Sequence, residues 1–256
     1  MNYPISYIPT RELKPRNAGQ TMVIDKGLTC VEAQGLVEDQ GDLIDYMKIG
    51  FGTALITKNI KKKLDIYKAA GVTPYFGGTL FELFIVRNQF NEYQKFLDSY
   101  GISVSEVSDG SMDMDHDAKL GYIRELSKNF TVISEVGSKD ANVVITPEEW
   151  ITQMKSELDA GSVKVITEAR ESGTIGIFNK DGSPNKTLID TIINNIDITK
   201  VMWEAPLKAQ QALFIKLLGY NVNLGNIATN EVIALEALRL GLRGDTFYQF
   251  LPESLK

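Results

Sequence analysis

The chain has 256 residues, of which 43% are hydrophobic and 23% charged, as is ordinary for a globular protein. Its net charge of −6 argues against nucleic acid as the main partner. No apolar run reaches the roughly 18–20 residues that a membrane helix needs, and the first residues lack the basic start and apolar core of a signal peptide, so no membrane association is expected. Cys30 is the only cysteine, which excludes an internal disulfide and favours a reducing, cytoplasmic location.

Along the chain, short apolar or β-branched runs alternate with amphipathic segments. Residues 1–20 contain three prolines and are expected to form an extended lead-in. Strands are predicted at residues 21–25, 46–53, 72–79, 103–107, 131–136, 163–168, 200–204 and 221–226. Helices are predicted near 32–40, 57–71, 80–99 (as one helix or two), 116–128, from 146 onward, 186–195, 206–218 and 229–240. The helix that starts at Thr146 is marked by a capping box with Glu149.

This alternation predicts an α/β fold, and successive strand ends lie roughly 30 residues apart, which is the size of a βα unit. Eight such units predict a (β/α)8 TIM barrel that forms a single domain over residues 1–256, with 1–20 as the lead-in and 241–256 as a C-terminal tail. A doubly wound sheet is the alternative, but it would usually carry a GxGxxG phosphate fingerprint after the first strand, and this sequence has none there.

The stretch VKVITEARESG (163–173) shows how the predicted strands end, because a β-branched run breaks into charged residues and then a turn. The carboxyl ends of barrel strands share one rim, so the polar residues at this and the other strand ends are expected to meet there. They are Asp25, Lys26, Lys48, Glu106, Asp109, Glu135, Lys139, Glu168, Arg170, Glu204 and Asn223. Carboxylates from several strands could hold a divalent metal, and the lysines and the arginine could hold anions.

Several of these residues also have a purely structural interpretation. Lys48 lies within a strand, so it would need a carboxylate partner in either a structural or a functional ion pair. The strand-end glutamates could likewise form buried ion pairs, but their recurrence at four strand ends favours function. Glu82 follows Thr79 by three residues, so we interpret it as a capping-box residue rather than as a ligand.

Other charged residues are interpreted as helix surface. His116, the only histidine, lies at an expected helix start, and Asp113, Asp115 and Asp117 around it resemble a solvated N-terminus favoured by the helix dipole. The run 61–63 of three lysines is expected to form a solvated helix face.

Nine motifs, in this order, resemble the phosphosulfolactate synthase family over about residues 11–250: TMVIDKG, KIGFGT, GGTLFE, EVSDGS, EVGSK, TEARESG, WEAP followed by KAQQ, VNLGNI and GLRGDT. One departure is Ser138, where the family often has a second lysine, so only Lys139 of that pair is present. The resemblance implies an enolase-like barrel and a Mg²⁺-dependent addition of sulfite to phosphoenolpyruvate that gives (2R)-phospho-3-sulfolactate.

The chemistry of that reaction suggests roles for individual residues at the rim. Lys139 is expected to be the general acid, with Lys26 and Lys48 as competitors for that role. Magnesium would be held by the strand-end glutamates Glu106, Glu135, Glu168 and Glu204. Anionic substrate groups would be bound by Arg170, Ser108, Asn223, Gly225 and Asn226. The small anions phosphoenolpyruvate and sulfite are the expected partners, together with further copies of the chain in a homo-oligomer.

Two other functions stay open at this point. Plant heat-stress-associated proteins resemble the same family, so a protective role on this fold is one alternative, and it predicts the loss of the rim charges. A Schiff-base aldolase that uses Lys48 or Lys139 as its nucleophile is the other. In the C-terminal tail, Gly241 is expected to cap the last helix, and Arg243 is expected to stabilise the tail rather than to bind substrate.

Overall fold

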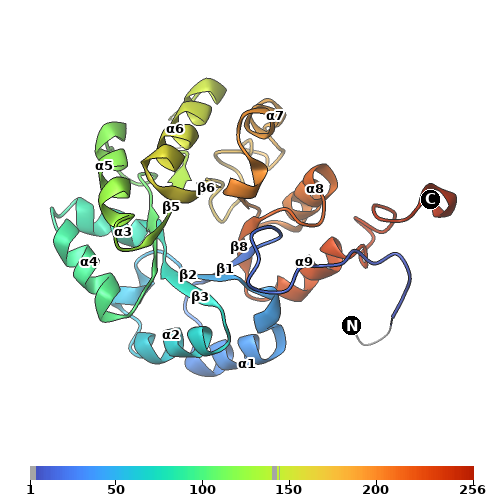
Figure 1. The fold of residues 1–256 in the computed structure, drawn as a ribbon, viewed down its shortest axis with the longest axis horizontal. Coiled ribbons are helices and arrows are strands. Elements are labelled where there is room, and N and C mark those ends of the chain that lie inside the picture. The colour runs from blue at the N-terminus through green and yellow to red at the C-terminus, as the bar shows by residue number, and fades with distance from the viewer. Residues whose placement is uncertain (1–3, 140–142, 144) are drawn as a thin grey trace.

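The computed structural model of the chain describes residues 4–139, 143 and 145–256. Within them, parallel strands close into a barrel in the order β1 to β8, and β8 pairs with β1 (Figure 1). The strands are β1 (Thr21–Asp25), β2 (Tyr46–Ile49), β3 (Thr73–Phe76), β4 (Val104–Val107), β5 (Thr131–Val136), β6 (Ser162–Thr167), β7 (Val201–Glu204) and β8 (Leu224–Ala228). The predicted (β/α)8 TIM barrel is therefore confirmed.

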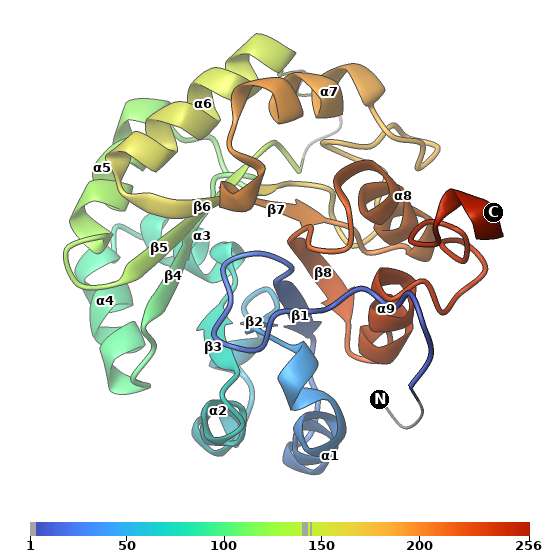
Figure 2. The ribbon, with the colours of Figure 1, turned by 45° about the vertical axis from the view of Figure 1, so that its right-hand side comes forward.

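Helices surround the strands as an outer layer (Figure 2). They are α1 (Cys30–Gln40), α2 (Ile60–Ala69), α3 (Gly78–Ile85), α4 (Phe90–Ser99), α5 (His116–Leu126), α6 (Pro147–Ala160), α7 (Lys186–Asn195), α8 (Lys208–Leu218) and α9 (Val232–Arg239), with 3₁₀ turns at Gly41–Leu43, Thr53–Leu55, Ile198–Lys200 and Glu253–Leu255. The segment 80–99 contains most of α3 and all of α4, and Asn88 adopts a left-handed φ of 55° between them. No helix in the described part of the chain is both long and apolar enough to cross a membrane.

Local signals placed several helix ends correctly. Thr146 and Glu149 form the predicted capping box at the start of α6, and Asp115 caps α5 by accepting a hydrogen bond from the Ala118 N–H. Gly241 follows α9 with a φ of 70°, and the N–H of Leu242 donates to the carbonyl of Ala237, which caps the helix as predicted.

The predicted solvated lysine face of α2 is wrong for one of its three members. Lys61 and Lys62 are exposed, but the Lys63 side chain is 1% exposed and its Nζ lies 2.7 Å from Oδ2 of the fully buried Asp25. The Tyr67 hydroxyl donates to the same oxygen. Lys63 faces the barrel because it lies one helical turn before Tyr67 on the buried face of α2.

The strand β8 begins three residues later than predicted, and this moves two expected site residues away from the rim. Asn223 precedes β8 at the opposite end of the barrel, where its side chain donates to the carbonyls of Thr199 and Val201 and accepts from the N–H of Gln20. Gly225 lies inside β8, and a Cβ there would approach Met22 Cε to 2.6 Å. The prediction that Asn223 and Gly225 lie at the rim is therefore wrong: Asn223 joins the N-terminal strand ends, Gly225 makes room for core packing, and neither lines the rim cavity.

The lead-in covers this N-terminal end of the barrel; its residues 1–3 lie outside the described ranges. Arg16 forms a buried ion pair with Asp45 at 2.8 Å, just before β2. The Lys14 ammonium donates to the carbonyls of Gly41, Ile44 and Gly71. These bonds attach an otherwise irregular segment to the strand starts and leave the C-terminal rim as the end of the barrel that carries the large cavities described below.

Candidate active site

A cavity of about 420 Å³ opens at the C-terminal ends of the strands, where the sequence predicted the functional rim. Its wall includes charged side chains from the ends of five strands, namely Lys48 (β2), Glu106 (β4), Glu135 and Lys139 (β5), Glu168 and Arg170 (β6) and Glu204 (β7). A second cavity of about 710 Å³ lies beside it and shares Ser111, Lys139 and Arg170 with the first. Charged side chains from far-separated parts of the sequence therefore meet in one place.

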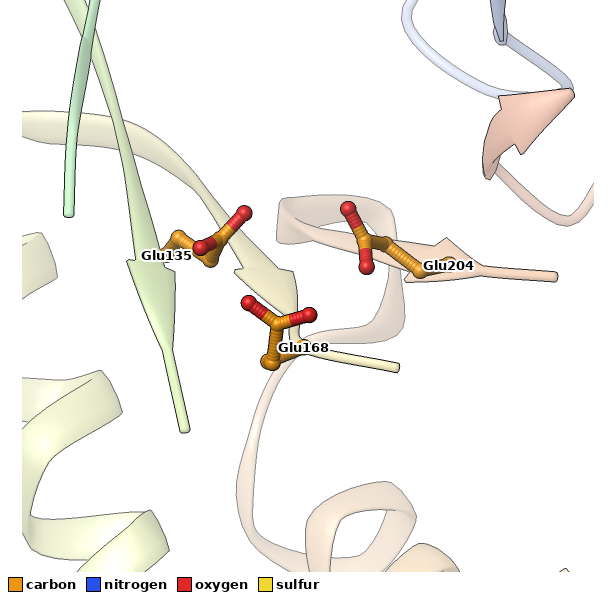
Figure 3. A group of neighbouring side chains, drawn as sticks. All are labelled: Glu135, Glu168 and Glu204. Carbon is orange, nitrogen blue, oxygen red and sulfur yellow. The ribbon is translucent and has the colours of Figure 1, made fainter. Parts of the chain in front are cut away.

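Three glutamates from neighbouring strands converge in this cavity (Figure 3). Glu135 lies near the end of β5, Glu168 follows β6 directly, and Glu204 is the last residue of β7. One carboxylate oxygen from each lies within 4.8 Å of the other two, and all three residues are buried. Glu168 Oε2 and Glu204 Oε1 accept no hydrogen bond from any described residue. This set of oxygens has the chemistry that Mg²⁺ prefers.

The fourth predicted metal ligand, Glu106, lies outside that group. Its Oε1 accepts a hydrogen bond from the Gly78 N–H at the start of α3 and lies 3.0 Å from Lys48 Nζ. Glu106 thus holds the first turn of α3 and a central lysine, while the other three glutamates share a different part of the cavity.

Two lysines lie among these carboxylates. Lys48 Nζ lies 3.0 Å from Glu106, 3.4 Å from Glu135 and 3.6 Å from Glu204. Lys139 Nζ lies 2.9 Å from Glu135 and 3.5 Å from Glu168, and its side chain is 19% exposed against 9% for Lys48. Lys139 is therefore the more accessible of the two ammonium groups.

Glu82 was misread from the sequence. It makes no capping box, because Gly77 caps α3 without a side-chain hydrogen bond. Its buried carboxylate accepts a hydrogen bond from the Ser108 hydroxyl and lies 3.8 Å from Lys139 Nζ. The one signal in the sequence is the spacing of Gly78 and Glu82, which lie four residues apart and so share one face of a helix. The structure shows that this face packs against the end of β4, where a Cβ on Gly78 would clash with Ser108.

Burial and mutual charge decide the protonation of this cluster. Burial alone would lower the pKa of both lysines, but the surrounding carboxylates outweigh it and raise the pKa of Lys48 and of Lys139 above the ordinary value. Both therefore stay ammonium ions at neutral pH. Burial also raises the pKa of Glu168, with a further contribution from Glu135 and Glu204, and it raises the pKa of Glu204 to about 7. Burial acts in the same sense on Glu135, but Lys139 and Lys48 reverse it and lower its pKa.

The remaining predicted site residues lie in three different environments. Arg170 is exposed, with a left-handed φ of 53°, and lines both cavities. Asn226 is buried, has a φ of 54° in β8 and lines the smaller cavity, and its Oδ1 has no partner among the described residues. Ser108 is buried and donates to Glu82, so its hydroxyl points into the glutamate–lysine cluster. Lys26 is half-exposed and does not line the cavity, but its ion-pair partner Glu171, at 2.8 Å, does.

Comparison with known proteins gives a consistent result for nearly the whole chain. The sequence model of the (2R)-phospho-3-sulfolactate synthase (ComA) family matches residues 9–245. The chain is 42% identical to a phosphosulfolactate synthase of Bacillus subtilis over 94% of its own length and 97% of that protein's. It is also 42% identical to a phosphosulfolactate synthase of Methanocaldococcus jannaschii, over 90% of this chain and 94% of the other.

Solved structures support the fold alone. The 3-hexulose-6-phosphate synthase from Salmonella typhimurium superimposes with a TM-score of 0.57 at 13% identity, covering 88% of this chain and all of the other. The 3-keto-L-gulonate-6-phosphate decarboxylase from Vibrio cholerae gives a TM-score of 0.53 at 12% identity, over 92% of this chain and all of the other. The family match and the identities of 42% over at least 90% of the chain carry the assignment: the chain belongs to the (2R)-phospho-3-sulfolactate synthase family.

Proposed function

We propose that this chain adds sulfite to phosphoenolpyruvate and so forms (2R)-phospho-3-sulfolactate. The observation that carries the proposal is the position of Lys139, a partly exposed ammonium held between Glu135 and Glu168 at the barrel rim of a member of this family. A reaction between two anions needs positive charge in the site, and Lys48, Lys139 and Arg170 all line the cavity.

The proposed reaction forms one C–S bond and one C–H bond. The sulfur lone pair of sulfite attacks the methylene carbon C3 of phosphoenolpyruvate, and the electrons of the C2–C3 double bond move into the carboxylate to give an aci-carboxylate. Lys139 then gives a proton to C2, and its amine takes a proton back from bisulfite or water. In balance, one sulfite, one phosphoenolpyruvate and one proton give the product. Lys139 suits this role because its carboxylate neighbours keep it protonated until negative charge develops beside it.

The proposed roles of the other residues follow from their positions. Lys48 is held by three carboxylates and would act mainly as fixed positive charge beneath the substrate. Arg170 would bind the phosphate or the sulfonate through its planar fork of donors. Asn226 is the one residue of β8 that lines the cavity, so we propose that it alone of this strand contacts the anionic substrate.

The carboxylate group fits a divalent cation. Among the described residues, five buried carboxylates, those of Glu82, Glu106, Glu135, Glu168 and Glu204, form ion pairs only with Lys48 and Lys139. Glu135, Glu168 and Glu204 would hold Mg²⁺, because their oxygens already lie within 4.8 Å of one another. When bound, the ion would supply positive charge against the developing aci-carboxylate, an effect worth several kcal/mol in such sites.

The alternatives have less support. A Schiff-base lysine needs a neutral amine, but the carboxylates around Lys48 and Lys139 raise the pKa of both. A purely protective protein would not need the charged rim, which is present here.

The cytoplasmic location and the homo-oligomeric state remain predictions. Light scattering on the purified protein would check the oligomeric state.

The decisive experiment is product analysis. The purified protein is incubated with sulfite, phosphoenolpyruvate and Mg²⁺, and the products are followed by ³¹P NMR and mass spectrometry. We expect a new phosphate ester whose mass equals that of phosphoenolpyruvate plus sulfurous acid, and we expect the Lys139→Met variant to form it at least roughly 10²-fold more slowly. Unchanged phosphoenolpyruvate with the native protein would refute the proposed function, and a borohydride-trapped adduct with a carbonyl substrate would instead indicate the aldolase.

A further inference from the structure

A buried lysine that does not line the cavity contacts two segments that carry residues of the candidate active site, β5 and the loop after β4. Lys119 belongs to α5, and its side chain is 1% exposed. Its Nζ donates to the backbone carbonyl of Glu135 at 2.6 Å and to Asp109 Oδ1 at 2.8 Å. It also forms an ion pair at 2.8 Å with Glu157 of α6, which is fully buried. One ammonium group therefore joins β5, the loop after β4 and two outer helices.

The contact with Asp109 continues to the Lys139 side chain. Asp109 precedes Gly110, whose carbonyl accepts a hydrogen bond from the Lys139 N–H at 3.0 Å. A Cβ on Gly110 would lie 3.1–3.3 Å from Cγ, Cδ and Cε of Lys139, so this turn packs directly along the lysine stem. The position of the Asp109–Gly110 turn thus limits where the Lys139 ammonium can lie.

The hydrogen bond from Lys119 to the Glu135 carbonyl affects Glu135, the carboxylate partner of Lys139. The Glu135 side chain and its carbonyl belong to one residue, so a shift of this part of β5 moves the carboxylate that lies 2.9 Å from Lys139 Nζ. Lys119 therefore controls the backbone that carries Glu135 and the turn that supports Lys139, without lining either cavity.

We propose that Lys119 is a positioning residue for the reaction: it sets Glu135 through its backbone carbonyl and Lys139 through the Asp109–Gly110 turn. This proposal rests on the proposed function for the identity of the catalytic pair. A buried ammonium is a costly way to join two helices, because ion pairs of this kind can often be replaced by apolar side chains without loss of stability. Its direct bonds to the backbone of the site provide a reason for its presence.

The test separates positioning from stability by removing the buried charges together. Lys119→Met alone would leave the fully buried Glu157 without its countercharge, so the main variant is K119M with E157Q. We expect this double variant to melt close to the native protein, to keep KM for phosphoenolpyruvate within about twofold, and to lose at least roughly tenfold in kcat, because small displacements of catalytic groups have large effects on rate. D109N, at a side chain that is 24% exposed, should give a smaller loss of kcat, since it loosens only the Lys139 side.

The matched control is R16M with D45N, which removes a buried ion pair of 2.8 Å at the opposite end of the barrel. It should leave the kcat of the folded protein unchanged, whatever its effect on the melting temperature. A native kcat in the K119M/E157Q variant would overturn the proposal, as would equal effects of the two double variants on kcat.

A second measurement does not depend on activity. Amide hydrogen exchange at Lys139 reports the bond from its N–H to the Gly110 carbonyl. We expect exchange there to become at least about tenfold faster in K119M/E157Q than in the native protein and to stay native in the control. If the native protein makes no phosphosulfolactate, the proposed function fails by itself; unchanged exchange at Lys139 in the variant would overturn the positioning role in either case.

Discussion

Removing divalent cations should destabilise the protein most at alkaline pH. The perturbation is treatment with EDTA and dialysis, followed by the return of Mg²⁺. The reason lies in the crowded carboxylates: Glu168 and Glu204 have raised pKa values because burial and neighbouring negative charges oppose their ionisation. A bound proton or a bound cation can relieve this repulsion. As the pH rises the carboxylates lose their protons, so a cation is then needed more.

The sign of the effect follows from Glu204. Its pKa rises from an ordinary value of 4.5 to about 7 in the folded protein. Between these values the folded state binds a proton that the unfolded state has lost, so the stabilisation is fully present below the unfolded pKa and is lost as the pH rises through the folded one. A rise of this size corresponds to about 3 kcal/mol, as an order of magnitude. In the metal-free protein, the contribution of Glu204 to the free energy of unfolding should therefore be smaller at about pH 8 than at about pH 5.5.

Magnesium should reverse this loss. An ion present at 100 times its dissociation constant stabilises the folded state by about 2.7 kcal/mol, which shifts the melting temperature of a chain of this size by roughly 5–10 °C. The shift should appear at about pH 8 and shrink at about pH 5.5, where protons compete for the same oxygens.

The assay is a thermal melt at both pH values, with and without Mg²⁺, and with Na⁺ at matched ionic strength as the control. Glu204→Gln should reduce the Mg²⁺ shift and flatten its pH dependence, because it removes one of the three converging carboxylates. Equal small shifts at both pH values, or a native shift in Glu204→Gln, would refute the reasoning about this cation site.

Four further predictions concern single side chains. Lys139→Met should lower kcat by roughly 10²-fold or more and leave KM for phosphoenolpyruvate nearly unchanged, as steady-state kinetics would show; a native kcat would move the general acid to another lysine. Glu82→Gln should lower kcat by about 3–10-fold, since it removes one carboxylate charge near Lys139 while an amide can still accept the hydrogen bond from the neighbouring serine; no change would assign Glu82 to packing alone. Lys63→Met should cost about 3–5 kcal/mol of stability in denaturant titrations because it leaves a buried aspartate unpaired, whereas Lys62→Met on the exposed face should stay within about 0.5 kcal/mol. Arg243→Ala should lower the melting temperature by a few degrees at most, because its contact with Asp245 is 3.8 Å and half-exposed, and a large rise in KM for phosphoenolpyruvate would instead place it in substrate binding.

Local patterns in the sequence predicted the architecture because they are set by neighbouring residues. The ranges of β1, β5 and α7 agree with the prediction residue by residue. Thr146 and Glu149 form the predicted capping box at the start of α6. The strand-end position of the glutamates also follows from local pattern, because a parallel barrel places every strand's carboxyl end at one rim. Fold, rim and most of the charged cluster could therefore be predicted from the chain alone.

Tertiary structure decided which of these side chains meet. A shift of three residues at the start of β8 was enough to place Asn223 at the opposite end of the barrel and Gly225 in its core. Spacing along the chain also could not show that Glu82 of α3 reaches Lys139, or that Lys63 of α2 reaches Asp25. The convergence of Glu135, Glu168 and Glu204 depends on the stagger of β5, β6 and β7. That stagger is set by hydrogen bonds and packing between residues far apart in sequence, and those contacts exist only once the barrel has closed.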